Sequence, residues 1–146
     1  MDNSDVRWIQ RFNNYKKALL KLSSVVERDD LDELSELETE GFIQRFEYTF
    51  ELAWKTLQDL LHYKGYTDIA GPNPVLAQAL QDGYIVDADQ WRSMKKSREL
   101  TSHTYNSDTA EEIADNIIGS YYKLLKNLEA KLEEERHGKQ ANLFEE

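Results

Sequence analysis

The sequence contains no cysteine, and among its 146 residues there are only 6 glycines and 2 prolines. Without cysteine the chain cannot form disulfides, zinc fingers or a thiol nucleophile. Glycine and proline interrupt helices, so their scarcity beside abundant leucine, glutamate and lysine indicates a helical protein. No apolar run approaches the roughly 18 residues that a membrane-spanning helix needs, and we therefore expect no membrane association.

Acidic residues outnumber basic ones by 28 to 18, which gives a formal net charge of −10. This balance argues against nucleic-acid binding over the whole surface, because the phosphates would be repelled. The first residues lack the basic and apolar regions of a signal peptide, so we expect a cytoplasmic protein. The length is typical of one domain.

Two long helices are predicted in the first half of the chain. Residues 5–28 place apolar side chains on one face, namely Trp8, Phe12, Tyr15, Leu19, Leu22 and Val26. The acidic residues 27–40 then indicate a solvated connector, which can contain a short turn of helix at Leu31, Leu34 and Leu37. A second helix is predicted for residues 40–64, with Thr39 as its N-cap. Its buried stripe comprises Ile43, Phe46, Phe50, Ala53, Trp54, Leu57, Leu60 and Leu61.

Glycine and proline divide the middle of the chain. Gly65 suits the left-handed conformation that follows a helix. Pro74 can lie in the first turn of a short third helix, which Gly83 closes.

Two capping patterns mark the remaining helices. Asp87 opens a fourth helix with Trp91 and Met94 facing inward, and Asp108 opens a fifth in the same way. The fifth helix continues to about Arg136 with heptad-like spacing of Ile113, Ile117, Tyr121, Leu124, Leu128 and Leu132. The sequence therefore predicts an all-α, up-and-down four-helix bundle with one short extra helix. Residues 1–136 form a single domain in this interpretation, and residues 137–146 form a frayed tail.

The residues that usually carry enzyme chemistry are sparse. His62, His103 and His137 lie far apart and match no metal-ligand spacing, so we expect no metal. No glycine-rich phosphate loop and no nucleophile elbow is present, so we expect no cofactor.

One stretch is locally basic in this acidic chain. Arg92, Lys95, Lys96 and Arg98 lie within eight residues that contain no acid, and they form a candidate phosphate-binding patch. Arg98 shares the buried face of the fourth helix with Met94. It therefore needs an anionic partner, either a carboxylate from another helix or the phosphate of a ligand.

His103 follows Arg98 by five residues and adds a group that can act as acid or base. The two side chains can meet only if the helix ends between them or if a second subunit supplies its own copy. Together they suit metal-independent RNA cleavage: the imidazole takes the 2′-hydroxyl proton and the guanidinium stabilises the phosphate. One histidine per chain favours a homodimer or larger assembly with a shared site. The structural alternative is that Arg98 pairs with a buried glutamate, His103 caps a helix end and Tyr105 packs.

Arg98, His103 and Tyr105 resemble the Arg-x4-His-x-Tyr signature of the HEPN superfamily and its HepT toxins. The block Thr101–Tyr105, together with residues 43–55, resembles the nucleotidyltransferase-substrate-binding branch more closely. The resemblance covers the chain from about Trp8 to Leu128.

This resemblance implies helical bundles that dimerise and that act beside a small nucleotidyltransferase of the MntA type encoded nearby. In HepT toxin–antitoxin pairs the helical protein is a metal-independent RNase, and the positions of its arginine and histidine match Arg98 and His103. The partner transfers AMP to the tyrosine that matches Tyr105. HEPN RNases usually carry Asn, Asp or His after the arginine. Glu99 stands there in this chain, where it could orient a catalytic group or repel RNA.

Three functions follow as hypotheses, the third being a structural helical dimer whose motif is vestigial. In the first, the chain is a binding or substrate subunit of the nucleotidyltransferase, with Tyr105 as its AMP acceptor. In the alternative, it is a HepT-like RNase that uses Arg98 and His103 in a dimeric site, with RNA as the substrate.

Overall fold

Six α-helices make up most of the computed structural model, which describes residues 4–145 and has no strand among them. They are α1 (Ser4–Val26), α2 (Glu36–Tyr63), α3 (Pro72–Gln81), α4 (Ala88–Glu99), α5 (Ser107–Asn116) and α6 (Tyr122–Glu145). Three short helical segments join them: the 3-10 turns η1 (Leu31–Glu33) and η2 (Leu100–His103), and the π-helical turn η3 (Ile117–Tyr121).

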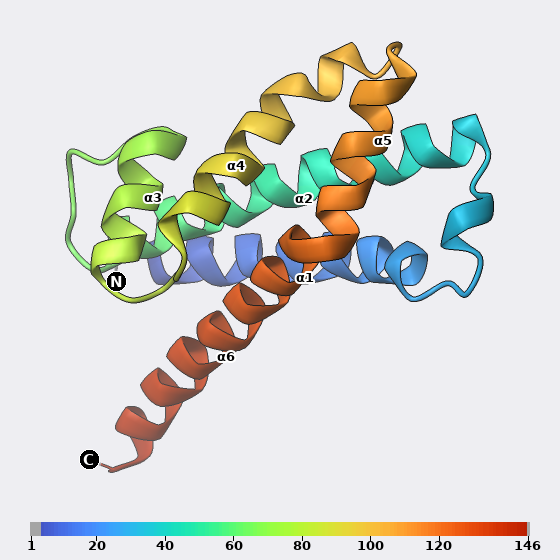
Figure 1. Ribbon diagram of the computed structural model, residues 1–146. Helices are drawn as coiled ribbons and strands as arrows, with labels where there is room; N and C mark the ends of the chain where they lie inside the picture. Colours follow the sequence, from blue (N-terminus) through green and yellow to red (C-terminus); the bar gives the residue numbers. More distant parts are fainter. Residues whose placement is uncertain (1–3, 146) are drawn as a thin grey trace.

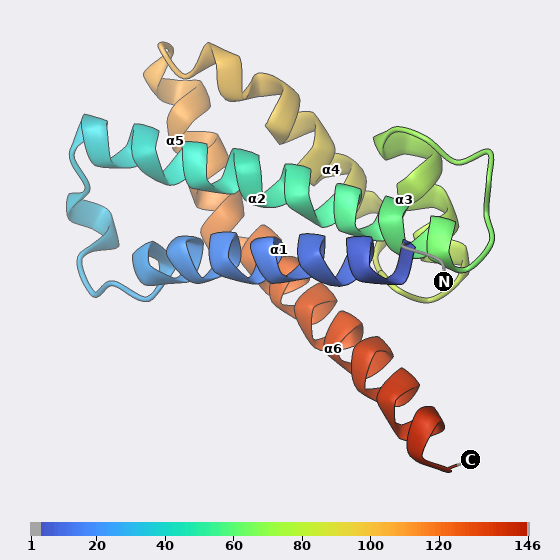
Figure 2. The same cartoon turned by 180° about the vertical axis from the view of Figure 1, so that it is seen from behind.

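Helix α2 lies at the centre of the arrangement. Figures 1 and 2 show α1 running beside it in the opposite direction, while α4 and α5 cover its other side. The short α3 packs near the C-terminal end of α2, and α6 crosses α1 before it extends away from the other helices (Figure 2). The predicted all-α bundle with one short extra helix is confirmed.

The core follows the predicted helical stripes closely. On α1 the predicted stripe is buried from Trp8 to Leu22 (Trp8, Phe12, Tyr15, Leu19 and Leu22), while Val26 is only half-buried. Trp91 and Met94 on α4 are buried as well. The predicted heptad positions from Ile113 to Leu132 are buried too. On α2 the stripe is buried except for Trp54, which is only half-buried at the edge of the core. The aromatic stripes therefore hold the helices together and are not available as a binding surface.

The start of α2 differs from the prediction. Thr39 is not its N-cap; the helix begins at Glu36 and Ser35 caps it. The hydroxyl of Ser35 accepts from the backbone N–H of Glu38 at 3.1 Å, and the carboxylate of Glu38 accepts from the N–H of Ser35 at 3.0 Å. This reciprocal pair satisfies two free donors and allows the helix to start four residues early.

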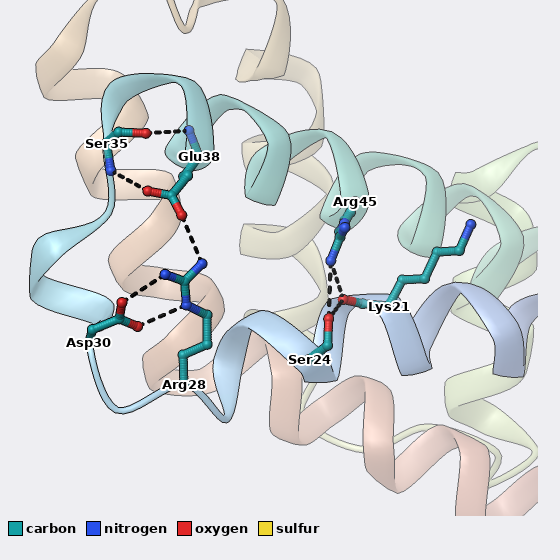
Figure 3. Close-up of polar contacts among 7 residues, drawn as sticks. All are labelled: Lys21, Ser24, Arg28, Asp30, Ser35, Glu38 and Arg45. Atoms are coloured by element: carbon teal, nitrogen blue, oxygen red, sulfur yellow. Dashed lines mark hydrogen bonds and ion pairs between the residues drawn. The ribbon is translucent and has the colours of Figure 1, made fainter.

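The acidic connector is not merely solvated, because an arginine binds part of it. Arg28 donates through Nε to Asp30 at 2.8 Å and through Nη1 to Glu38 at 2.9 Å (Figure 3). The guanidinium thus joins the end of α1 to the first turn of α2.

The middle helices are bounded as predicted: Gly65 follows the end of α2, Gly83 follows the end of α3 and Asp87 precedes α4. Gly65 and Gly83 have φ values of +108° and +83°, which are the left-handed conformations expected after a helix. Helix α3 begins at Pro72, two residues before the predicted Pro74, since both prolines fit in a first turn. Asp87 caps α4 by accepting from the N–H of Gln90.

The last long helix differs from the prediction in two ways. Asn106, not Asp108, caps α5, and its side-chain oxygen accepts from the N–H groups of Asp108 and Thr109 at 2.9 and 3.4 Å. The helix is also interrupted by η3, although the predicted apolar face is retained. The backbone of α6 remains helical to Glu145, past the Arg136 boundary predicted for the tail.

Within residues 4–145, none of the helices combines the length and the apolar character needed to cross a membrane.

Candidate functional site

The candidate site lies where α4 ends. The α-helix stops at Glu99 and continues as the tighter 3-10 turn η2, which ends at His103. Asn106 then starts α5. The motif residues therefore span a helix end, a 3-10 turn and the loop before α5, not one regular helix.

Arg98 is held mainly by α2. Its Nε donates to Oε1 of Glu51 at 2.9 Å, and the side chain is 30% exposed. The terminal nitrogens make longer contacts of 3.5 Å, from Nη2 to Glu47 and from Nη1 to Thr101. The anionic partner that the sequence requires for Arg98 is thus a carboxylate in this structure. The guanidinium is oriented through Nε, while its terminal edge is only loosely bound.

His103 and Tyr105 lie together on the surface. Nδ1 of His103 is 3.4 Å from the hydroxyl of Tyr105, and the two rings meet edge to face at a centroid distance of 5.9 Å. The Tyr105 side chain is 83% exposed, so it does not pack into the core. Of the structural alternative, the pairing of Arg98 with a glutamate is confirmed, although the Glu51 side chain is 30% exposed and not buried. The packing of Tyr105 is wrong.

A shallow groove of about 470 Å³ lies beside Tyr105. The side of α2 forms one wall with residues that include Glu40 and Glu47, and the turn after α4 forms the other. The lining residues of that turn are Thr101, Ser102, Thr104 and Tyr105. The groove therefore presents hydroxyl groups next to Glu47, one of the two carboxylates that contact Arg98. We call it the Tyr105 groove.

The basic patch on α4 is partly neutralised by acids of its own helix. Arg92 forms an ion pair with Asp89, and Lys95 donates to Glu99 at 2.6 Å. This hydrogen bond lowers the pKa of the Glu99 carboxyl. Lys96 is exposed. Glu99 therefore contacts Lys95 in this structure, and among the described side chains it forms no hydrogen bond with Arg98 or His103.

Arg98 and His103 do not meet within one chain. Across residues 5–138, whose side chains are described, no hydrogen bond joins them. Arg98 turns to α2, whereas His103 turns to Tyr105. A site that uses both groups on one phosphate needs either a rearrangement or a second copy of the chain.

Tyr121, which the sequence placed only in the core, also holds the end of α4 in position. The hydroxyl of Tyr121 is 2.8 Å from Oγ of Ser97, and both side chains are buried. The Tyr121 ring stacks on Phe46 of α2 at 5.6 Å. Because Tyr121 belongs to η3, this π turn anchors the residue that precedes Arg98.

Glu47 and Glu51 were not singled out from the sequence as site residues. They lie four residues apart, and so on one face of α2, inside the block of residues 43–55 that carries the family resemblance. The sequence signal that could have identified them is this spacing of two acidic residues next to the predicted aromatic stripe. Over the described residues, no three His, Asp or Glu side chains are grouped as a metal site.

Comparison with protein families gives a match over most of the chain. Residues 10–134 match the family described as "Nucleotidyltransferase substrate binding protein like". A Haemophilus influenzae protein named "Probable ribonuclease HepT" is 34% identical over 92 residues, which are 58% of this chain and 63% of that relative. The chain thus matches less than two thirds of the length of this relative.

Two solved structures have a similar fold. A crystal structure of a Thermus thermophilus protein is 33% identical with a TM-score of 0.70, covering 81% of this chain and 98% of the other. HI0074 from Haemophilus influenzae is 25% identical with a TM-score of 0.65, covering 90% and 99%. HI0074 is described as showing the fold of a substrate-binding domain of a nucleotidyltransferase.

Proposed function

The chain belongs to the nucleotidyltransferase substrate-binding protein family, as its two sequence blocks predicted, and we propose that it acts as the helical partner subunit of a small nucleotidyltransferase. In this proposal the partner is of the MntA type and is encoded nearby, and it transfers AMP from ATP to the hydroxyl of Tyr105. The two proteins form a toxin–antitoxin-like pair.

The exposure of Tyr105 is the observation that carries this proposal. A tyrosine ring normally buries much of its apolar surface, yet this side chain is 83% exposed at the edge of a groove. It lies on the turn between α4 and α5, where another protein can reach its hydroxyl. Tyr15 and Tyr121, in contrast, are buried and use their hydroxyls within the fold.

The proposed transfer is a substitution at the α-phosphorus of ATP. The Tyr105 oxygen forms a new bond to that phosphorus, the bond from it to the bridging oxygen breaks, and pyrophosphate leaves. The phenolic proton goes to Nδ1 of His103, which is 3.4 Å from the hydroxyl. His103 thereby has a role that needs no contact with Arg98.

The test is to incubate the purified chain with the nearby nucleotidyltransferase, ATP and Mg²⁺, followed by intact-mass and peptide mass spectrometry. We expect a mass increase of one or more adenylyl groups, located on Tyr105, and none in Tyr105→Phe. Tyr48→Phe is the matched control, since Tyr48 lies on α2 and is less exposed. Failure of the two proteins to co-purify, together with unmodified Tyr105, would refute the proposal.

The alternative function is a metal-independent RNase, which the name of the Haemophilus relative favours. The loosely held terminal edge of Arg98 can bind a phosphate once RNA displaces Glu47, with its 3.5 Å contact. His103 of a second copy then supplies the acid or base. The patch of Arg92, Lys95 and Lys96 holds neighbouring phosphates, and Glu99 orients one of the two catalytic side chains.

RNA incubated with the unmodified protein in EDTA tests this alternative. We expect 2′,3′-cyclic phosphate ends that disappear in His103→Ala and Arg98→Ala, while His62→Ala retains activity as a matched histidine control. The pH profile of cleavage should be bell-shaped, because one copy of His103 acts as the base and the other as the acid. Intact RNA at high protein concentration would exclude the alternative and leave the subunit role in place.

A further inference from the structure

A second groove, of about 440 Å³, adjoins the Tyr105 groove, with Thr104 lining both. One side of it is formed by the connector and the start of α2, and the other side by α5. Figures 1 and 2 show α5 beside the first half of α2. Its apolar lining comes from both sides and from the π turn: Leu31, Leu34, Ala110, Ala114 and Ile118. We call it the α5 groove.

Five carboxylates surround this apolar lining, and no Lys, Arg or His accompanies them. They are Asp32, Glu36, Glu40, Glu111 and Asp115. All five are exposed, and in the described part of the chain none of them makes an ion pair. By contrast, the carboxylates of Glu38, Glu51 and Glu133 each bind an arginine or a lysine. The α5 groove therefore combines apolar surface with uncompensated negative charge.

We propose that the α5 groove binds a segment of the partner nucleotidyltransferase in which apolar side chains are flanked by Lys or Arg. This inference rests on the proposed function and assigns the partner to a surface. The apolar side chains of the segment cover Ile118, which is 38% exposed, and the neighbouring leucines. Its cations pair with the five carboxylates. This attraction raises the rate of association and disfavours binding of acidic partners.

The position of the groove supports this occupant. Glu40 and Thr104 line both the α5 groove and the Tyr105 groove, so the two surfaces are continuous. A protein bound in the α5 groove therefore lies next to the Tyr105 hydroxyl, where AMP transfer is proposed. RNA does not fit this groove, since its phosphates would face five carboxylates without a cation.

Charge reversal within one helix tests the inference. Glu111→Lys/Asp115→Lys changes two exposed residues that line the groove. Asp68→Lys/Glu112→Lys makes the same change in net charge at exposed residues outside it. Binding to the purified nucleotidyltransferase encoded nearby is measured by calorimetry at several salt concentrations, with circular dichroism as the folding control. AMP on Tyr105 is measured in parallel.

We expect the groove variant to weaken binding by roughly tenfold or more and to slow modification of Tyr105, while the control variant changes binding much less. Wild-type affinity should fall with added salt, and that dependence should be smaller in the groove variant. Equal binding of both variants would overturn the groove assignment and leave the subunit role standing. Absence of binding by the wild type would overturn both. A change in the oligomeric mass of the isolated chain that is confined to the groove variant would instead assign the groove to a second copy.

Discussion

Arg98 and Glu51 are joined by a hydrogen bond of 2.9 Å from Nε to Oε1, which links the end of α4 to the middle of α2. Glu51 is itself held in place, because its other oxygen accepts from Nε1 of Trp54 at 3.2 Å. The carboxylate therefore orients the guanidinium from a fixed position. Glu47 approaches only a terminal nitrogen, at 3.5 Å.

This asymmetry predicts different costs for two similar substitutions. Glu51→Gln should lower the free energy of unfolding by about 0.5–1 kcal/mol, because it weakens a partly exposed, charge-assisted bond. Glu47→Gln should have a smaller effect, since it removes only the long contact. Urea unfolding of both variants measures the difference, and equal losses would contradict the assigned roles.

The need for an anion beside Arg98 could be predicted from the sequence, because Arg98 shares a helix face with Met94. Its partner could not be predicted, since Glu51 lies 47 residues away and only packing of α4 on α2 brings it close. The same limit applies to His103, whose contact with Tyr105 depends on where α4 ends.

The helices themselves were largely predictable because apolar periodicity reflects burial. The errors lie at helix starts, where several capping patterns compete. Ser35 with Glu38 forms a capping box that the sequence contains, but the surrounding acids suggested a solvated connector. Asn106 satisfies the first turn of α5 before Asp108 can. The π turn could not be predicted from the apolar periodicity, because its apolar residues keep a spacing that also suits an α-helix.

Loss of the Tyr121 hydroxyl should destabilise the fold. Tyr121→Phe removes the buried 2.8 Å contact and leaves Oγ of Ser97, a 7% exposed residue, without that partner. We expect a loss of about 1–3 kcal/mol in the free energy of unfolding.

Two variants serve as controls for this prediction. Tyr48→Phe should change stability by less than about 0.5 kcal/mol, because Tyr48 is only half-buried and takes no part in the contact between Tyr121 and Ser97. Adding Ser97→Ala to Tyr121→Phe should cost less than the sum of the single changes, since both polar groups are then removed. Strict additivity in thermal unfolding would show that the two hydroxyls are not coupled.

Gly41 offers a stabilising substitution. It lies inside α2, and no heavy atom outside its own helix backbone and chain neighbours is within 4 Å of the position an alanine Cβ would take. Gly41→Ala should therefore raise the free energy of unfolding by about 0.5–1 kcal/mol, through helix propensity. Gly65→Ala should instead lower it by roughly 1–2 kcal/mol, because φ is +108° there. A stabilising Gly65→Ala or a destabilising Gly41→Ala in urea unfolding would contradict this distinction.

The contribution of Arg28 to stability should depend on pH. Its hydrogen bond lowers the pKa of Asp30 below the ordinary 3.8. The backbone N–H of Ser35, followed by Arg28, lowers the pKa of Glu38 below 4.5. Because both carboxyls have a lower pKa in the folded state, the unfolded chain binds more protons as the pH falls. The stabilisation is therefore complete above the unfolded pKa values and is lost as the pH drops through the folded ones.

We expect the stability difference between wild type and Arg28→Gln to be constant near neutral pH and to shrink below about pH 4. Arg45→Gln is the matched control. Arg45 donates to the carbonyl of Lys21 at 2.8 Å and to the hydroxyl of Ser24 at 3.1 Å, and neither acceptor titrates in this range (Figure 3). Its effect on urea unfolding should therefore be the same at pH 7 and pH 3. A difference for Arg28→Gln that persists unchanged at pH 3 would show that the guanidinium stabilises the connector by packing and not by binding two carboxylates.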